Sequence, residues 1–537
     1  MDFPSIIDRF DQTVRDNPDG TAIQTADRAV DYRDFGKLTD ELADELGTRC
    51  APGEFVGIDA TRGLEAITAL LAALKAKRPF VFLDHRDSDT SNARKTRLLG
   101  LQLMAGADGA LTDIPERWRG GDAQAPAIEG DVCYAIHTSG STGEPKCVLI
   151  RATPLAAVID DHVRRLAVGP GSRTLQFARL TFDGCVTEIL WTLTAGGCLV
   201  VLDEARLAPG AELRDTLERH RVTHLKTTPF ALTATDPTDA MRLEHVVNGG
   251  GACRPAVVAK WSAAADFHNA YGTTETTVCN FLSGPLRAEE CGAGVPLGEV
   301  VGACDYHLRD GEIVITGDSV GIGYLTDEGV LPFDGEYRTG DIAELRDGGL
   351  HFVERLDRQV KVRGYRLDPG EIENAVCAAD SVTEAVVTVE SHDGSRGADQ
   401  DALVCYYQGD ADPRELRRHL EQVLDPYKIP SVLDRVAAFP YTPNGKVDRD
   451  ALQQSRQTHP GGASSPDERV LDVVRGLTGV RDAGLDDNFF DIGGDSASAL
   501  ALVGRMREFG WGDAGVRDVL RAPDLRTLAK QLHERSG

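Results

Sequence analysis

The sequence predicts a large α/β unit, then a small α+β unit, then an all-α unit of four helices. The large unit follows from the stretch up to about residue 355, where helical patterns alternate with short β-branched runs. Tyr32–Leu46 and Gly63–Lys77 are helix-like, and Cys198–Leu202 and Glu244–Val247 are strand-like. Alternation of this kind is typical of helices layered against a sheet.

The pattern changes from about residue 358 onward. Short strand-like runs occur at Gln359–Val362, Val382–Val389 and Ala402–Gln408, and helix-like runs at Gly370–Ala379 and Pro413–Leu424. This order predicts a small α+β unit, because neither element type repeats in the alternating way seen in the large unit.

A polar tether separates the last unit from the rest of the chain. Residues 453–466 are rich in Ser, Gly and Pro, which favours a flexible linker. The roughly 70 residues beyond it show helical patterns throughout, and Pro466 opens the first helix. We therefore predict domains at 1–356, 357–452 and 467–537, with the linker at 453–466.

Acidic residues outnumber basic ones. Asp and Glu total 85, Lys and Arg total 58, and the formal net charge is −27 at pH 7. A surplus of this sign opposes nonspecific binding to nucleic acid. A polyanionic substrate would have to be met by local groups, namely Gly-rich backbone, a few placed cations and a metal ion. We expect no nucleic-acid partner. We also expect no membrane partner, since apolar stretches such as Leu70–Leu74 are too short to cross a bilayer.

The cysteines and the amino terminus favour a reducing, cytoplasmic location. The eleven cysteines form no CxxC pair, so neither a structural zinc site nor a disulfide framework is indicated. Buried apolar thiols explain them. The start Met-Asp-Phe-Pro-Ser lacks the positive and apolar regions of a signal peptide. His220 and His224, one helical turn apart without an HExxH context, predict a surface pair and not a metal site.

The most informative local motif is YAIHTSGSTGEPKCV at Tyr134–Val148. Its glycines let the backbone turn N–H groups toward an anion, and its hydroxyls add donors. The pattern differs from the GxxxxGK[ST] P-loop because Pro145 precedes the lysine. The alternative is a plain solvent-exposed loop. The motif predicts a phosphate-binding loop whose functional residues are Thr138, Ser139, Gly140, Ser141, Thr142, Gly143 and Lys146.

Here the sequence resembles the adenylate-forming superfamily, and within it the adenylation domains of nonribosomal peptide synthetases. Further family motifs follow in the family's order and cover nearly the whole chain. They are FDGCVTEI at Phe182–Ile189, NAYGTTET at Asn269–Thr276, GEIVITGDSVGIGYL at Gly311–Leu325, YRTGD at Tyr337–Asp341, ERLDRQVKVRGYRLDPGEIE at Glu354–Glu373, DPYKIP at Asp425–Pro430 and NGKVDR at Asn444–Arg449.

The resemblance implies roles in binding ATP and Mg²⁺. Tyr271 would offer an aromatic face to adenine, and Asp341 would accept hydrogen bonds from both ribose hydroxyls. Arg355 would reach the same sugar or a phosphate, and Thr274 would donate near the α-phosphate. Glu275 would hold Mg²⁺, a hard cation that prefers oxygen ligands.

The resemblance also implies two mechanistic positions in the small unit. Lys446 would lie between the substrate carboxylate and the α-phosphate, where it would stabilise developing charge. Asp357 matches the family's hinge, about which the small domain rotates between two poses. One pose brings Lys446 to the adenylate, and the other brings the Gly364 region beside a tunnel for the incoming thiol.

The last unit is similar to a peptidyl carrier protein. Its motif is DNFFDIGGDS at Asp487–Ser496, and Ser496 would carry the 4′-phosphopantetheine arm. In isolation a serine in this position is more often only a helix N-cap. The carrier resemblance also implies a phosphopantetheinyl transferase as a partner.

The remaining implied residues concern the amino acid. In amino-acid-activating members the acid of the FD motif, here Asp183, holds the substrate α-ammonium, for which aryl and fatty-acid ligases have no use. Alignment of the motifs with the family gives the side-chain pocket as Gly184, Thr187, Lys226, Val247, Gly249, Ala270, Val278 and Cys279.

Lys226 directs the choice of substrate. An ammonium in a closed pocket requires an acceptor or negative end on the substrate. The set Thr187, Lys226, Val247 and Gly249 resembles pockets for aspartate and asparagine, and Gly184 and Ala270 leave space for an extra carbon or substituent. We expect aspartate or a β-substituted aspartate first, glutamate second and asparagine third, with tyrosine as an outside candidate.

The predicted function is ATP-dependent activation of an amino acid and its transfer as a thioester to Ser496. The chain leaves no room for a condensation or thioesterase domain, so trans-acting tailoring or condensation enzymes would use the product, with a small MbtH-like helper as a further partner. One alternative is an acyl-CoA-ligase-like enzyme, against which Asp183 and the fused carrier argue. Another is a catalytically silent binding or regulatory module, which Lys446, Glu275 and Asp341 speak against.

Overall fold

In the computed structural model, the chain forms two compact units, one of residues up to Arg366 and one from Leu367 onward. The structure describes residues 5–119, 128, 131–138, 146–291, 294–346, 349–356, 359–362, 365–379, 381–391, 401–440, 447, 449, 451–453, 466–478, 483–492, 494, 499, 502–503, 506 and 515–536.

A nine-stranded sheet carries most of the candidate site in the first unit. Six of its neighbouring strands, from β13 to β1, run parallel. In spatial order the strands are β15 (Glu299–Val300), β14 (Phe281–Leu282), β13 (Asp266–Tyr271), β12 (His245–Asn248), β11 (His224–Thr227), β9 (Arg173–Leu175), β10 (Cys198–Val200), β1 (Thr21–Gln24) and β2 (Ala29–Asp31). Ligands of such sheets bind at the carboxyl ends of the strands.

An eight-stranded mixed sheet forms the second large layer of this unit. In spatial order it contains β19 (Gly329–Pro332), β18 (Gly323–Thr326), β8 (Lys146–Arg151), β7 (Val132–Thr138), β4 (Phe80–Leu83), β3 (Val56–Asp59), β5 (Leu103–Ala105) and β6 (Leu111–Asp113). Strands β7 and β8 are antiparallel neighbours, so both ends of the predicted phosphate-binding loop lie at one edge of this sheet.

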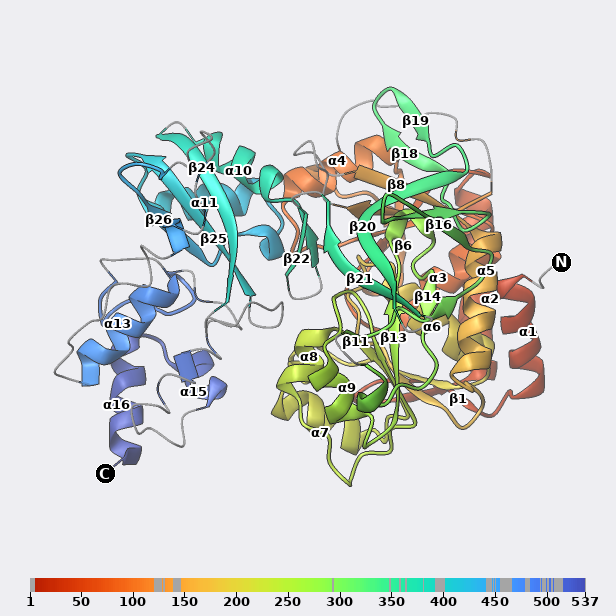
Figure 1. Cartoon of the computed structure of the whole chain (residues 1–537). Helices are drawn as coiled ribbons and strands as arrows, with labels where there is room; N and C mark the ends of the chain where they lie inside the picture. Colours follow the sequence, from red (N-terminus) through yellow and green to blue (C-terminus); the bar gives the residue numbers. More distant parts are fainter. Residues whose placement is uncertain are drawn as a thin grey trace. The chain divides into compact units, whose positions relative to one another are not determined.

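Helices cover both large sheets. Two helices are apolar on almost every face, α3 (Leu64–Lys75) and α6 (Gly184–Thr194), and they share one core with strands of both sheets. A helix that is apolar all round is a buried helix. Figure 1 shows three further helices gathered at the nine-stranded sheet, and they share a second core with it: α7 (Ala211–Arg219), α8 (Pro229–Ala234) and α9 (Pro255–Trp261).

The remaining helices of this unit lie toward its amino-terminal half. They are α1 (Ile6–Asp16), α2 (Tyr32–Arg49), α4 (Asp89–Leu99) and α5 (Ala152–Arg165). Local sequence explains where they start. The Ser5 side chain accepts a hydrogen bond from the Asp8 amide in a capping box, and Asp31 does the same for the Asp34 amide of α2.

Two smaller sheets complete the first unit. One is antiparallel and contains β16 (Asp305–Arg309), β17 (Glu312–Thr316), β20 (Glu336–Arg346) and β21 (Gly349–Arg355). The other is the two-stranded pair β22 (Val360–Val362) and β23 (Tyr365–Leu367), which lies at the end of this unit.

The second compact unit contains the predicted α+β and all-α parts. Its three-stranded sheet is β24 (Val382–Ser391), β25 (Asp401–Gly409) and β26 (Val432–Arg435), accompanied by α10 (Pro369–Cys377) and α11 (Pro413–Val423). The described helices toward the carboxyl terminus are α13 (Pro466–Thr478), α15 (Val516–Arg521) and α16 (Leu525–Ser536), which share one apolar core. The predicted fold class is confirmed, and the exact domain boundaries stay predictions.

The prediction for His220 and His224 is wrong. His220 follows the end of α7, but His224 is the first residue of β11 and is only 1% exposed. The chain leaves its helix between the two histidines, so the spacing of one helical turn does not bring them together. Among the described residues, none of the helices combines the length and apolarity needed to span a membrane.

Candidate functional site

The residues predicted to bind the amino acid come from the start of α6 and the carboxyl ends of β11, β12 and β13. Lys226 on β11 is in register with Val247 on β12. Asp183 lies at the N-cap position of α6, but its side chain accepts no capping hydrogen bond from the first turn of the helix. Because parallel strands end at the same edge of a sheet, these positions converge there.

The Lys226 ammonium contacts neutral oxygens of α6. Its Nζ donates to Thr187 Oγ1 at 2.6 Å and lies 3.4 Å from Gly184 O. Thr187 in turn donates to Gly184 O at 2.8 Å. Among the described residues, no carboxylate forms an ion pair with Lys226, so the contacts seen there leave its charge without an anionic partner.

Two glycines border Lys226 closely enough that an added Cβ would contact it. A Cβ built on Gly184 would lie 3.7 Å from Lys226 Nζ and 3.6 Å from Ala178 Cβ, and one on Gly249 would lie 3.5 Å from Lys226 Cε. These are ordinary contact distances, so a larger residue at either position would fill volume directly next to the ammonium. Ala178 is a wall residue that sequence reasoning missed.

The other predicted pocket residues are apolar and belong to the core that contains α6. Val247 and Cys279 are each 2% exposed, and Ala270 and Val278 pack against the same cluster. Val278 has a φ of 67°, an unusual conformation for a β-branched residue. The backbone folds back tightly here, since a Cβ on Gly272 would approach Val278 O to 2.4 Å. Glycine is therefore required at this turn.

An aromatic pair lies beneath Lys226, and sequence reasoning missed it. Lys226 Nζ is 5.8 Å from the centroid of the Trp191 ring, within cation–π range. His162 stacks on the same indole at 5.3 Å with an interplanar angle of 24°. The available signal was helical spacing, because Trp191 is one turn beyond Thr187 on α6. Burial lowers the pKa of His162 to about 4, and the Lys226 charge acts in the same direction, so this ring is neutral.

A buried carboxyl, Glu188, lies on the same helix. It accepts hydrogen bonds from the backbone N–H groups of Phe177 at 3.0 Å and Ala178 at 3.1 Å. Burial raises the pKa of Glu188 to about 7, although the charges of Lys226 and Arg62 act in the opposite direction. Glu188 is therefore partly protonated near neutral pH and does not fully compensate the Lys226 charge.

Asp183 and Thr274 meet at the amino-acid end of the site. Burial raises the pKa of Asp183, and a hydrogen bond from the Thr274 side chain and the charge of Lys226 partly offset this. A buried carboxylate in this condition gains from a cationic partner. The substrate α-ammonium would supply that cation.

The predicted nucleotide residues form one hydrogen-bonded group. Tyr271 OH donates to Asp341 Oδ2 at 2.5 Å, and Arg355 pairs with the other oxygen of the same carboxylate. Asp341 is 2% exposed and Tyr271 8%. Sequence reasoning identified all three residues but not their mutual contacts. Asp341 and Arg355 face each other on the neighbouring strands β20 and β21, and Tyr271 comes from β13, far away in the chain.

The ends of the phosphate-binding loop are described. Thr138 closes β7, Lys146 opens β8, and the two residues pair in register. The Thr138 hydroxyl is buried and has no hydrogen-bond partner among the described residues. Lys146 Nζ lies 4.7 Å from the centroid of the Tyr324 ring. An unpartnered buried hydroxyl beside a lysine fits a site for a nucleotide phosphate.

Glu275 fits a magnesium ligand in chemistry and position. It is 1% exposed, and its Oε1 accepts a hydrogen bond from Tyr324 OH at 3.0 Å. Within the described ranges, no group of three or more His, Cys, Asp or Glu side chains could hold a metal ion. A single carboxylate suffices where nucleotide phosphates supply further oxygen ligands, as is usual for Mg²⁺.

Several predicted site residues lie outside the described residues. They are Ser139, Gly140, Ser141, Thr142, Gly143, Asp357, Lys446 and Ser496.

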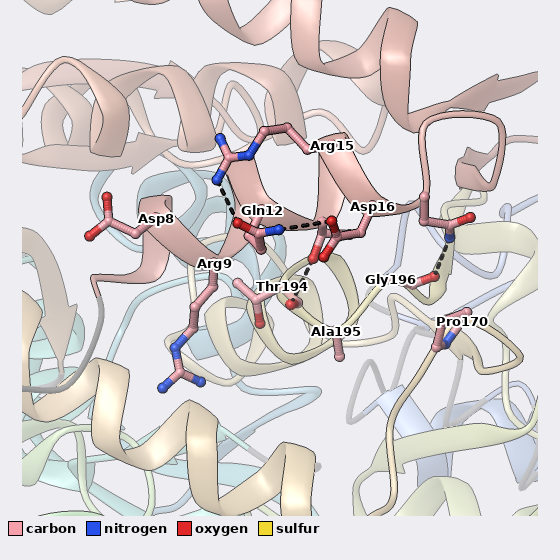
Figure 2. Close-up of a pocket in the computed structure, with 11 residues that line it drawn as sticks. Asp8, Arg9, Gln12, Arg15, Asp16, Pro170, Thr194, Ala195 and Gly196 are labelled. Atoms are coloured by element: carbon pink, nitrogen blue, oxygen red, sulfur yellow. Dashed lines mark hydrogen bonds between the residues drawn. The ribbon is translucent and has the colours of Figure 1, made fainter.

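A groove of about 590 Å³ lies elsewhere on the first unit. Figure 2 shows its lining side chains on α1 and at the end of α6, where Thr13 Oγ1 donates to Thr194 O at 2.9 Å. No predicted site residue lines this groove. The candidate site uses the opposite end of α6, so the groove is a different feature.

Comparisons with known proteins agree with this geometry. The family model described as AMP-binding enzyme matches residues 87–325, and the model for the AMP-binding enzyme C-terminal domain matches residues 371–446. The model for a phosphopantetheine attachment site matches residues 468–532. The three matches follow the order of the predicted units.

Similar proteins include one of the same length and several that are far longer. Novobiocin biosynthesis protein H of Streptomyces niveus is 33% identical over 98% of this chain and 95% of its own length. Bacitracin synthase 3 of Bacillus licheniformis is 32% identical over 99% of this chain, which spans only 9% of that synthase. Among solved structures, holo-PA1221, an NRPS protein with adenylation and PCP domains bound to a vinylsulfonamide inhibitor, matches with a TM-score of 0.81, 26% identity and coverage of 99% and 97% of the two chains.

The site geometry, the three matched family models and these relatives lead to one assignment. The chain belongs to the AMP-binding, adenylate-forming enzymes of nonribosomal peptide synthesis, as an adenylation domain fused to a phosphopantetheine-bearing carrier domain.

Proposed function

We propose that this chain activates an acidic amino acid with ATP and Mg²⁺ and transfers it to a phosphopantetheine arm on its own Ser496. Aspartate or a β-substituted aspartate is the preferred substrate, ahead of glutamate and asparagine. The observation that carries the choice of substrate is the Lys226 ammonium, which contacts only neutral oxygens and an aromatic face among the described residues.

The substrate side chain would supply the missing anion. Lys226 offers up to three donors, and Thr187 Oγ1 and Gly184 O leave donor capacity for a carboxylate. An aliphatic side chain would leave a half-buried ammonium without a counter-ion, which costs several kcal/mol. The space beside Gly184 admits a substituent or one extra carbon. This ordering favours aspartate and tolerates its β-substituted forms.

The chain's own residues would prepare the first step by positioning and charge. Asp183 would hold the α-ammonium and Lys226 the side-chain carboxylate, which fixes the orientation of the reacting α-carboxylate. Glu275 would hold Mg²⁺, and Lys146 and Thr138 would contact phosphate oxygens. Mg²⁺ supplies charge neutralisation at those oxygens. Lys446 would stabilise the charge that develops at the α-phosphate.

Tyr271, Asp341 and Arg355 would bind the nucleoside. Their contacts hold the Asp341 carboxylate in a fixed orientation in which it could also accept the ribose hydroxyls. Such fixed acceptors lose little freedom on binding. Thr274, which donates to Asp183, would serve the α-phosphate as well.

The second step would move the aminoacyl group from AMP to the thiol of the arm on Ser496, forming a thioester and releasing AMP. A rotation about Asp357 would separate this step from the first. The arm requires a phosphopantetheinyl transferase. Trans-acting tailoring or condensation enzymes would consume the product, and an MbtH-like protein is a candidate helper.

Ser496→Ala separates the two steps. The variant should keep aspartate-dependent pyrophosphate exchange near the wild-type rate, because the carrier takes no part in forming the adenylate. After treatment with a phosphopantetheinyl transferase, ATP and aspartate, intact-mass measurement should show an arm plus aspartyl group on the wild type and neither on the variant. Loading of the alanine variant would disprove the assignment of Ser496.

A further inference from the structure

Strands β22 and β23 bring three side chains against the candidate site. The Tyr365 ring packs edge-on against Phe182 with centroids 5.0 Å apart, and its hydroxyl accepts a hydrogen bond from Arg179 at 3.3 Å. Lys361 Nζ lies 6.0 Å from the centroid of the Tyr271 ring. The strand pair therefore touches both the amino-acid end and the nucleotide end of the site.

The third side chain, Arg366, pairs with Glu275. Its Nη1 lies 3.0 Å from Glu275 Oε2 and 3.3 Å from Oε1, so one guanidinium nitrogen spans both carboxylate oxygens. The two side chains are 19% and 2% exposed. Arg366 Nε also donates to Gln359 Oε1 at 2.7 Å, which fixes the guanidinium from a second direction.

The electrostatics of Glu275 follow from this pairing. Arg366 contacts both carboxylate oxygens, and Tyr324 OH donates to Oε1 at 3.0 Å, so a cation and a hydroxyl hold the buried carboxylate. The carboxylate is thus ionised in a buried place because a cation of the protein stands beside it. A buried acid and a buried arginine stabilise each other in this way.

We propose that Arg366 and Mg²⁺ compete for Glu275, so that the arginine occupies the metal ligand whenever the metal is absent. The inference rests on the proposed function, in which Glu275 holds Mg²⁺. A magnesium–oxygen bond is about 2.0–2.1 Å long and demands near-octahedral geometry. A guanidinium nitrogen in contact with both carboxylate oxygens occupies the side of the carboxylate that faces it, and a second cation bound to the same oxygens would be repelled by the first.

The competition couples the metal to the position of β22 and β23. Binding of Mg²⁺ with ATP must displace Arg366, and with it the segment that carries Tyr365. Departure of Mg²⁺ with pyrophosphate lets Arg366 return and neutralise Glu275. The two equilibria affect each other equally. The metal weakens the pairing of Arg366 with Glu275, and that pairing weakens metal binding by the same factor.

The test measures what the metal contributes to nucleotide binding. The probe is α,β-methylene-ATP, which cannot release pyrophosphate, and calorimetry gives its Kd in saturating Mg²⁺ and in EDTA. The ratio of the Kd in EDTA to the Kd in Mg²⁺ measures what the metal adds to nucleotide affinity. A direct contact between Arg366 and phosphate that is present in both conditions cancels from this ratio. If Arg366 holds Glu275 in nine-tenths of the molecules, its removal raises this ratio about tenfold.

Four variants define the outcome. Arg366→Met should raise the ratio about tenfold, and Arg366→Lys should give a smaller rise because a flexible point charge replaces the planar fork. Glu275→Gln should bring the ratio close to one. Arg9→Met should leave it unchanged, because Arg9 pairs with Asp160 at the groove that lies apart from the candidate site. A thermal melt of each variant checks that it is folded. If Arg366→Met does not fold, Arg366→Lys alone tests the competition.

Two results would overturn the proposal and are distinguishable. In the first, both Arg366 variants give an unchanged or lower Kd ratio, while Glu275→Gln still brings the ratio close to one. That result would mean that Arg366 does not compete with the metal, although Glu275 remains its ligand. A wild-type ratio in Glu275→Gln would mean that Glu275 is not the ligand, and the metal part of the proposed function would fail with it.

Discussion

Lys226 is the side chain on which the proposed substrate class depends. Its ammonium lies over Trp191 and beside Thr187, groups that accept a cation without neutralising it. The proposed function therefore assigns the partner charge to the bound amino acid. Burial raises the pKa of the nearby Glu188 to about 7, so that acid compensates the Lys226 charge only in part near neutral pH.

Lys226→Met tests this reasoning. The variant should lose roughly two orders of magnitude or more in kcat/KM for aspartate in pyrophosphate exchange, as expected from about 3–5 kcal/mol for breaking a buried pair. Lys260→Met is the matched control, because Lys260 lies on α9 and pairs with Asp236, both outside the candidate site. It should behave as the wild type. A Lys226→Met enzyme that still prefers an acidic side chain would show that Lys226 is not in the pocket.

Some individual site residues could be predicted from the sequence, and others could not. Asp183 could be found because it stands in the FDGCVTEI motif, and Lys226 because alignment of the motifs with the family gives the pocket positions. Trp191 and Arg366 were missed, since what distinguishes them is a contact across the fold, to Lys226 and to Glu275 respectively. Tyr271 was found, but its hydrogen bond to Asp341 depends on the pairing of sheets and has no sequence signature.

At the scale of elements, three neighbouring parallel strands share a row of histidines. The His224 and His245 ring centroids are 5.1 Å apart, and those of His245 and His268 are 5.3 Å apart. His268 Nδ1 faces Ser283 O at 3.0 Å and must donate to it, so His268 Nε2 accepts from His245 Nδ1 at 3.1 Å. All the rings are satisfied as neutral imidazoles.

This row predicts a loss of stability in mild acid. Burial lowers the pKa of His224, His245 and His268 below 6.5, with neighbouring histidines acting in the same direction. The unfolded chain therefore binds more protons than the folded one once the pH falls below about 6.5. Stability should be complete above that pH and should decrease as the pH falls toward the folded pKa values.

Urea unfolding between pH 7.5 and 5 measures the effect. Each such histidine adds up to about 1.4 kcal/mol per pH unit to the slope of the free energy of unfolding. His245→Phe should make the slope shallower by up to one proton, whereas His307→Gln, at an exposed position of β16, should not change it. An identical slope in His245→Phe would exclude a contribution from the row.

The same elements explain which parts of the fold could be predicted. Long helices with clear periodicity, such as α2 and α11, fall close to their predicted ranges. Short strands depend on their partners, and His224 was misjudged because helix α7 ends at Arg219, before either histidine. The neighbouring strand, and not the local sequence, determines the state of that segment.

At the scale of the whole molecule, the order of the units could be predicted from the sequence, because the pattern of helix-like and strand-like runs changes between them. The three family models fall in the predicted order along the chain. The roles of Lys446, Asp357 and Ser496 come from motif resemblance, because these residues lie outside the described ones. The proposed function makes two claims. The chain forms an aminoacyl-adenylate, and the amino acid that it activates is acidic.

Amino-acid-dependent ATP–pyrophosphate exchange by the wild-type chain tests both claims in one measurement. The panel contains the proteinogenic amino acids together with β-hydroxy- and β-methyl-aspartate, and reactions without amino acid give the background. The account predicts the highest rate with aspartate or a β-substituted aspartate, then glutamate, then asparagine, because Lys226 requires an anion. A maximum on leucine, valine or phenylalanine would contradict the pocket assignment, and exchange at background with every amino acid would contradict the function itself.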